Sequence, residues 1–295
     1  LGLAKAWRAK AYAHWTAGGL SQAETASRRA IDFARRAGDE PLEAGMVSSH
    51  CFILFWGPKR VDEVARYVKQ ALEWARSRGI RRLEVDALRI LARIAAMQGR
   101  FPEARAWLRE ASEAEAYGDL LVLVGEYLSV GIVELLADEP AEAERVLRRG
   151  YQIVADLRGT GQLVSVIVLL ARALAMQGRD EEAMALTREC EGSALESQRD
   201  AQIKWRAIRA LLLARRGDFE AAKRLAAESI ERTEDWEQDD STAEVLADQA
   251  HVLRLAGREE EARRQAERAL AHYERKGNLV GARRVRMLLQ REPMH

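Results

Sequence analysis

The side chains that could carry out catalysis in this 295-residue chain are few and scattered. The five histidines include no pair at a metal-binding spacing, and no cysteine cluster accompanies them. His50 and Cys51 are neighbours, but consecutive helical side chains point about 100° apart and cannot easily share a ligand. The sequence contains neither a phosphate-binding G-x-x-x-x-G-K-[ST] loop nor a G-x-S-x-G nucleophile elbow. We therefore expect no catalytic residue, metal or cofactor in this segment.

Cationic, aromatic and apolar side chains at regular spacings suit partner binding better than catalysis. The candidate contact residues are Arg8, Tyr12, Trp15, Trp56, Arg89, Arg93, Leu128, Ile132, Arg172, Lys204, His251 and Arg254. Because arginine and lysine bind carboxylates, this set favours an acidic segment with apolar residues in its middle. The alternative is that the arginines pair with carboxylates of the chain itself and that the tryptophans only pack. The sequence leaves both interpretations open.

The elements that position these side chains repeat with a period of about 40 residues. Residues 99–111, 178–190, 217–229 and 257–269 are copies of one phrase that begins with Gly and has Ala five residues later. With weaker copies included, the turn position falls at Gly18, Lys59, Gly99, Asp138, Gly178, Gly217 and Gly257. A fixed period of this length is typical of a solenoid built from stacked repeats.

Each repeat is predicted to be a hairpin of two helices. Apolar residues recur every three or four positions between the turns, which is helical periodicity. Small residues recur at three fixed positions, as at Ala171 and Ala222, and would let the helices approach closely. The candidate contact residues fall on the groove-facing side of the first helix. Arg93 and Arg172 hold the same position two repeats apart, which places them on the order of 20 Å from each other.

The turns and helix starts also follow from local chemistry. A turn Gly supplies a positive φ where the first helix stops, so repeats two and four, which lack it, should have turns that are built differently. The segments at 21–24 and 241–244 fit capping boxes that open helices. The acidic run at 234–240 is expected to complement the dipole of the helix that opens at Ser241. A closing helix is predicted at 279–290.

The composition excludes several classes of protein. Charged residues make up 32% of the chain with a net charge of +1, which argues against a dedicated nucleic-acid-binding protein. No apolar run is long enough to span a membrane, and no signal peptide opens the chain. The two cysteines give no disulfide framework, so a cytoplasmic location is expected. Because the chain begins at Leu1 within a helical pattern, we interpret it as a fragment of a larger polypeptide.

The turn Gly, the Ala five residues later and the other small positions resemble the tetratricopeptide repeat pattern, although this unit is about five residues longer than the usual 34. The longer unit resembles the C-terminal superhelical domain of bacterial signal-transduction ATPases, including regulators of the maltose-activator type. Segments 1–15, 203–234 and 255–289 resemble the C-terminal region of bacterial proteins that join an adenylate/guanylate cyclase domain, an ATPase module and such repeats. The resemblance implies a sensor or regulatory arm.

These observations together predict an all-α protein. We expect residues 1–295 to form a single right-handed superhelix of seven two-helix repeats with a C-terminal capping helix. The expected function is non-catalytic binding of a protein, a peptide or upstream domains of the same chain, without nucleic acid or membrane. Two alternatives stay open: a helical toroid enzyme, and a small-molecule effector-binding domain of an ATP-dependent transcriptional activator.

Overall fold

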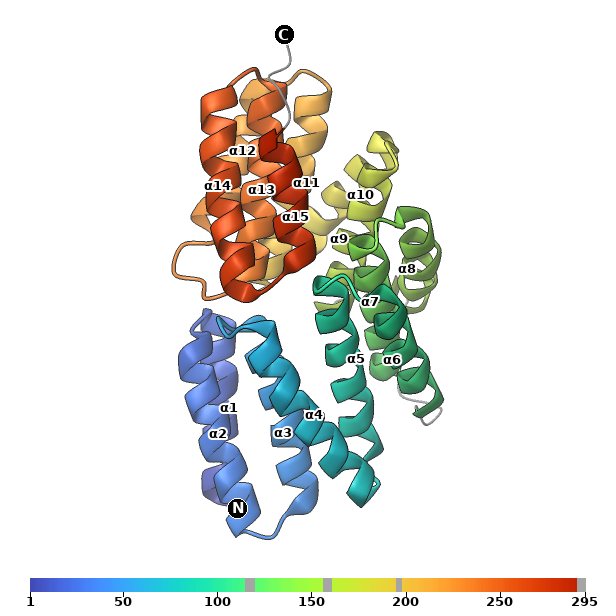
Figure 1. The fold of residues 1–295 in the computed structure, drawn as a ribbon, viewed down its shortest axis with the longest axis vertical. Helices are drawn as coiled ribbons and strands as arrows, with labels where there is room; N and C mark the ends of the chain where they lie inside the picture. The colour runs from blue at the N-terminus through green and yellow to red at the C-terminus, as the bar shows by residue number, and fades with distance from the viewer. Residues whose placement is uncertain (115–119, 156–160, 195–197, 291–295) are drawn as a thin grey trace. The chain divides into compact units, whose positions relative to one another are not determined.

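The computed structural model describes residues 1–114, 120–155, 161–194 and 198–290, which form fifteen helices and no strand (Figure 1). The helices are α1 (Gly2–Ala17), α2 (Leu20–Arg36), α3 (Glu40–Trp56), α4 (Val61–Arg78), α5 (Arg81–Met97), α6 (Phe101–Ala114), α7 (Leu120–Leu136), α8 (Pro140–Ala155), α9 (Gly161–Met176), α10 (Asp180–Ser193), α11 (Arg199–Arg215), α12 (Phe219–Glu231), α13 (Asp239–Leu255), α14 (Glu259–Lys276) and α15 (Leu279–Gln290). The all-α prediction of seven hairpins and a closing helix is confirmed, and α15 has the predicted bounds.

Packing divides the chain into two compact units. Unit 1 consists of Leu1–Gly118, Asp235–Asp239 and Arg275–Gly277, and unit 2 consists of Asp119–Glu234, Asp240–Glu274 and Asn278–His295. Unit 1 therefore contains helices α1–α6 with two short segments from later in the chain. Unit 2 contains helices α7–α12, most of α13 and α14, and α15. That all 295 residues form a single solenoid stays a prediction.

Small residues at the repeat positions form the closest contacts inside each unit. Ala23 of unit 1 and Ala222 of unit 2, both five residues after a turn, are fully buried. Where the small residue is Gly, a side chain would collide with a neighbour. A Cβ atom on Gly150 would lie 2.9 Å from Cβ of Tyr127, and one on Gly131 would lie 2.7 Å from Cδ2 of Leu147. The hairpins therefore pack at a spacing that a larger residue would disturb.

The turn of repeat four differs from the prediction. Asp138 adopts a φ of 63°, in the same left-handed region as Gly99 with its φ of 77°. The N–H of Glu139 donates to the carbonyl of Glu134 at 2.9 Å, as the N–H of Arg100 donates to that of Ala95 at 2.8 Å. The expectation of a different turn is wrong here, because Asp tolerates this conformation better than most residues and preserves the hydrogen bonds.

The turn of repeat two is built differently, as predicted. Helix α3 ends at Gly57, whose φ of −72° and ψ of −178° are extended rather than left-handed. In this arrangement the carbonyl oxygens of Phe55 and Gly57 both accept hydrogen bonds from Nζ of Lys276, which also belongs to unit 1. A side chain from the end of α14 thus satisfies the carbonyl groups that a glycine turn would have left to the backbone.

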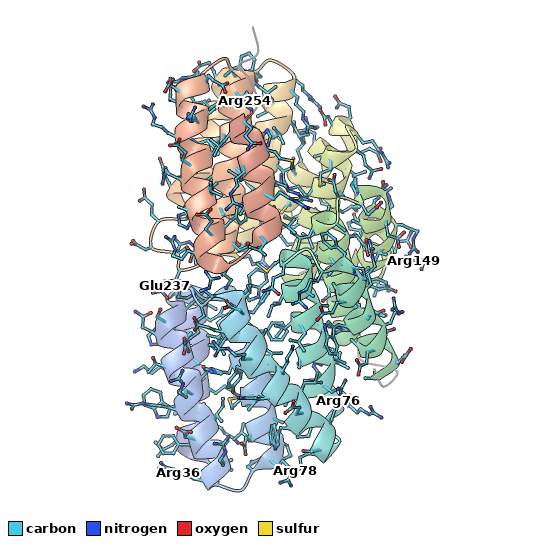
Figure 2. The ribbon with its side chains drawn as sticks, viewed as in Figure 1. Arg36, Arg76, Arg78, Arg149, Glu237 and Arg254 are labelled. Carbon is cyan, nitrogen blue, oxygen red and sulfur yellow. The ribbon has the colours of Figure 1, made fainter. Side chains whose placement is uncertain are left out.

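Neither predicted capping box opens its helix. Helix α2 begins at Leu20, and the N–H of Ser21 donates to Oε2 of Glu237, which lies beside the start of α2 in Figure 2. Helix α13 begins at Asp239, and the hydroxyl of Ser241 donates to Oδ1 of Asp200 at 3.1 Å. The prediction failed because side chains that are distant in sequence satisfy these groups. The acidic run does supply the first residues of α13.

Candidate binding surfaces

Arg172 of α9 lies in an ion-pair cluster inside unit 2. Its Nη1 donates to Oδ1 of Asp248 at 2.9 Å, its Nη2 donates to Oδ2, and Nη2 also lies 3.2 Å from Oε1 of Glu244. The side chains of Arg172 and Asp248 are only 13% and 10% exposed. Burial alone would lower the pKa of Arg172, but Asp248 and Glu244 more than offset that effect and hold the pKa above its ordinary value. This arginine therefore stays charged on account of partners in its own chain.

Lys204 of α11 extends the same cluster. Its Nζ lies 3.2 Å from Oδ1 of Asp200 and 3.7 Å from Oε2 of Glu244. Burial opposes the charge of Lys204, yet the two carboxylates raise its pKa above the ordinary value. For Glu244, burial is outweighed by Lys204 and Arg172, so its pKa is lowered. We call Arg172, Lys204, Asp200, Glu244 and Asp248 the charge cluster. It joins the first helices of repeats five, six and seven.

Within unit 2, helix α15 contacts the end of α7, the first helix of repeat four. Nη2 of Arg284 donates to the carbonyl of Leu135 at 2.8 Å and to that of Leu136 at 3.0 Å, at the end of α7. On α7, Leu128 and Ile132 are half-buried. Ile132 occupies the repeat position that Arg172 holds on α9. An apolar strip on α7 thus belongs to the same face of the repeats as the charge cluster.

The two remaining predicted contacts of unit 2 have different surroundings. Arg254 lies at the end of α13 (Figure 2), where Nη1 donates to the carbonyl of Leu288 at 2.9 Å and Nε lies 3.2 Å from Oε1 of Glu259. The hydrogen bond from Arg254 holds the pKa of Glu259 below its ordinary value. His251, one helical turn earlier on α13, is exposed. Arg254 therefore anchors α15, whereas His251 faces solvent.

In unit 1, Arg89 and Arg93 are buried along one face of α5. The guanidinium carbon of Arg93 lies 6.0 Å from the centre of the Phe55 ring. Burial first and the charge of Arg89 second lower the pKa of Arg93 to about 10, while Asp86 partly opposes them. At neutral pH Arg93 therefore remains charged, but in surroundings that disfavour the charge. Trp56, the predicted contact on α3, is half-buried with its ring centre 5.0 Å from that of Phe55.

Helix α1 presents the open part of the predicted surface. Lys5 and Arg8 are exposed, Tyr12 is 71% exposed and Trp15 is half-buried. Their spacing of three or four residues puts them on one stripe of the helix. No acidic residue occurs in α1, and no carboxylate among the described residues pairs with Lys5 or Arg8. These four residues form what we call the α1 stripe.

The environments of the neighbouring residues His50 and Cys51 lower the reactivity of both side chains at neutral pH. The Ser27 hydroxyl donates to the carbonyl of Glu24 at 2.9 Å, so Nδ1 of His50, 2.7 Å from that hydroxyl oxygen, must act as the donor to it. Burial, with Arg28 and Lys59 nearby, lowers the pKa of His50 to about 4. Burial raises the pKa of the Cys51 thiol to about 12, so the reactive thiolate is scarce at neutral pH.

The second cysteine is buried as Cys51 is, and the described ranges hold neither a metal-binding group of side chains nor a membrane-spanning helix. Burial likewise raises the pKa of Cys190 to about 12. Across residues 1–114, 120–155, 161–194 and 198–290, no group of three or more His, Cys, Asp or Glu side chains could hold a metal ion. No helix in those ranges is long and apolar enough to cross a membrane.

Two of the three carboxylates of the charge cluster, Asp200 and Asp248, lie outside the positions that the sequence predicts to face the groove. Asp248 lies nine positions before its turn, and Asp200 lies seventeen before its own. The candidate contact residues stand thirteen, ten, six or three positions before their turns, so the predicted set contains neither of these two carboxylates. An acid–base match between neighbouring repeats was the available signal, because Arg172 pairs with two carboxylates of repeat seven and Lys204 with one of its own repeat and one of repeat seven. The interpretation of chain-internal pairing therefore holds for Arg172 and Lys204.

Comparison with known proteins supports the repeat assignment. Residues 85–110 and 206–228 match the family model described as Tetratricopeptide repeat. These segments cover most of α5 and α6, and most of the α11–α12 hairpin. No curated protein sequence matches the chain.

Several solved structures share the fold at low sequence identity. A Rap protein complexed with Competence and Sporulation Factor is 18% identical, with a TM-score of 0.78 over 92% of this chain and 75% of that one. NprR in complex with its cognate peptide NprX is 11% identical, with a TM-score of 0.66 over 96% and 83%. A Signal Transduction ATPase with Numerous Domains from Pyrococcus horikoshii, which carries a tetratricopeptide repeat sensor, is 14% identical, with a TM-score of 0.51 over 89% and 42%. The chain thus has an all-α repeat fold of the tetratricopeptide kind, which resembles that of this ATPase.

Proposed function

We propose that this chain is a non-catalytic scaffold that binds a protein or peptide and acts as the regulatory arm of a bacterial signalling protein in the cytoplasm. The observation that carries the proposal is the half-buried apolar strip of Leu128 and Ile132 on α7. At the matching positions of α9, Val168 is buried and Arg172 is paired within the chain. The strip therefore offers apolar surface on a rigid frame of first helices, which is the kind of surface that repeat proteins use for binding.

The proteins of similar fold support a peptide or protein as the ligand. The Rap protein is bound to Competence and Sporulation Factor, NprR to its cognate peptide, and the Pyrococcus ATPase carries its repeats as a sensor. By analogy of fold, we infer that the partner is a separate protein or peptide, or domains upstream in the same polypeptide. The exposed cations of α1 favour an acidic partner.

Selection of peptides on the purified chain tests the proposed function. Peptides from a random phage-displayed library are synthesised with a fluorescent label, and their binding is measured by fluorescence anisotropy. We expect saturable binding by sequences that combine apolar and acidic residues. If no peptide binds saturably, and acidic and basic sequences give the same anisotropy, the chain does not have the proposed peptide-binding role.

A matched pair of variants locates the binding. Ile132→Arg should weaken the selected peptides at least about tenfold, because it replaces apolar surface by a charge. Arginine already occupies the same repeat position on α5 and α9, at Arg93 and Arg172, so the substitution suits the helix. Phe219→Arg is the control: it makes a similar change at a 38% exposed site on the second helix α12 and should leave affinity unchanged. Circular dichroism confirms that both variants remain folded.

A further inference from the structure

We infer that the α1 stripe (Lys5, Arg8, Tyr12 and Trp15) is a docking surface for an extended acidic segment of a protein partner. The inference rests on the proposed binding function and adds to it the place and the chemistry of recognition. It distinguishes the cations of α1 from the arginines and the lysine of the other helices, because the structure separates cations that are open to a partner from those that are engaged in the chain.

The cations of the α1 stripe differ from the other predicted cations. Arg172 and Lys204 are held by carboxylates of their own unit, and Arg254 is held by Glu259 and a backbone carbonyl. Arg89 and Arg93 are buried on α5. A partner could reach any of these only by displacing contacts that already exist.

Arg8 and Lys5, by contrast, are exposed and have no carboxylate partner in the described part of the chain. An incoming carboxylate would gain a charge-assisted hydrogen bond there without breaking one. Because α1 carries no acidic side chain, nothing on the helix repels such a ligand. Charge complementarity therefore points to an acidic partner.

Tyr12 and Trp15 add an aromatic surface to the α1 stripe. A tyrosine that is 71% exposed leaves a large aromatic face in water, and aromatic residues are over-represented where proteins bind one another. Trp15 is half-buried against the cluster of Ala11, Ala23, Ala26 and Ile53, which fixes its ring. An apolar or aromatic side chain of the partner would cover Tyr12 and rest on this fixed ring.

The spacing along α1 sets the length and polarity of the partner segment. From Lys5 to Trp15 the helix rises about 15 Å, at 1.5 Å per residue. An extended chain covers that distance in about five residues, at roughly 3.3 Å each. The segment should therefore carry its carboxylates at one end, opposite Lys5 and Arg8, and its apolar residues at the other, opposite Tyr12 and Trp15.

The test uses a labelled peptide with the core Glu-Asp-Gly-Leu-Phe between Gly-Ser flanks, measured by fluorescence anisotropy at low salt, where charge effects are largest. Two comparison peptides replace the acidic pair by Lys-Lys or the apolar pair by Ser-Ser. We expect the parent peptide to bind tightest. Lys5→Glu/Arg8→Glu should weaken it at least about tenfold, whereas Tyr12→Ala should weaken it but leave the Ser-Ser peptide unchanged.

The matched control is Arg66→Glu/Lys69→Glu on α4, which reverses two exposed cations at the same three-residue spacing. This variant should bind the parent peptide like the unaltered chain. Equal affinities for the unaltered chain and Lys5→Glu/Arg8→Glu would overturn the inference. So would equal or tighter binding of a single-stranded RNA or an anionic vesicle, because the stripe would then attract any polyanion. If library-selected peptides still bind the Lys5→Glu/Arg8→Glu variant, the scaffold function stands and only this docking surface is lost.

Discussion

Arg93 of unit 1 and Arg172 of unit 2 hold the same position in two repeats, yet they have opposite electrostatic surroundings. Burial and a neighbouring arginine lower the pKa of Arg93, whereas two carboxylates from a later repeat raise that of Arg172. The neighbouring Arg89 lies on the same helix as Arg93, whereas the carboxylates that hold Arg172 belong to another helix, α13. The position in the repeat therefore determines where a side chain lies on its helix, but not which side chains of other helices it contacts.

Two further buried groups, one in each unit, show the same difference in what shifts the pKa. In unit 1 burial dominates the pKa of His50, which falls to about 4. In unit 2 the carboxylates dominate that of Lys204, which rises despite burial. His50 and Arg93 of unit 1 are therefore buried where the surroundings disfavour their charge, whereas partners keep Arg172 and Lys204 of unit 2 charged. Substitutions of these buried groups test this comparison, beginning with the one that should change stability most.

Removing the charge of Arg172 should cost far more than removing that of Arg93. Arg172→Met leaves Asp248 buried beside an apolar side chain, so we expect the free energy of unfolding to fall by about 3–5 kcal/mol. Arg93→Met removes a charge that its surroundings disfavour and should cost less than about 1 kcal/mol. Urea unfolding of both variants measures the difference. Equal losses would mean that the opposite pKa shifts do not describe the two sites.

The double variant Arg172→Met/Asp248→Leu serves as the control for the first prediction. It removes both buried charges at once, and such replacements are often neutral or stabilising by a few kcal/mol relative to a broken pair. We expect it to recover more than half of the loss of Arg172→Met. A double variant as unstable as the single one would indicate that packing, rather than the unpaired carboxylate, caused the loss.

Acid should destabilise unit 1 through His50. Its pKa falls from 6.5 in the unfolded chain to about 4 in the fold, so the unfolded state binds the extra proton between these pH values. The contribution of His50 is therefore fully present above pH 6.5 and is lost as the pH falls to 4, by about 3 kcal/mol at most. His50→Gln should flatten the dependence of the urea midpoint on pH in that window.

The fold was predictable because it depends on local periodicity. The spacing of the turns and small residues predicted seven hairpins and placed the closing helix at 279–290, where α15 lies. The positive φ of Gly99 also follows from its own type and place. These features are repeated seven times, so each copy supports the register of the others.

The contacts of the candidate surfaces were less predictable because they join residues from distant parts of the chain. Arg172 and Asp248 are 76 residues apart, and Ser21 and Glu237 are 216 apart. A helical pattern gives the face of each residue but not the rotation of one repeat against another, which decides the partner. The openness of Lys5 and Arg8 depends on the same long-range packing. The assignment of the contact residues therefore stays a prediction.

Enlarging a buried small residue should destabilise both units by similar amounts, unlike the removal of a buried charge. Ala23 in unit 1 and Ala222 in unit 2 occupy the same close-approach position and are fully buried. Ala23→Leu and Ala222→Leu should each lower the free energy of unfolding by about 1–3 kcal/mol, and Ala171→Leu at a neighbouring small position by a similar amount. The exposed Ala185 supplies the control, since Ala185→Leu should be neutral. Unchanged urea midpoints for the buried sites would mean that the repeat register is wrong.

Substitutions in the turns should change the free energy of unfolding least. The change should have opposite signs in repeats four and five. Asp138 has a φ of 63°, which costs a residue with a side chain roughly 1–2 kcal/mol, although less for Asp. Asp138→Gly should therefore raise the free energy of unfolding by about 0.5 kcal/mol, after the greater freedom of Gly in the unfolded chain is included. The ion pair lost to Arg284 is long, at 3.9 Å, and largely exposed, so it contributes little.

Gly178→Ala is the reciprocal change, at a φ of 72°. A Cβ atom there would meet nothing within 4 Å, so the expected loss of about 1 kcal/mol is purely conformational. Gly45, inside α3 and equally free of neighbours, has no positive φ, and Gly45→Ala should instead stabilise by about 0.5–1 kcal/mol. The three thermal midpoints should therefore rise for Asp138→Gly, fall for Gly178→Ala and rise for Gly45→Ala. A fall in all three would show that the side chain of Asp138 stabilises the turn by more than its backbone conformation costs.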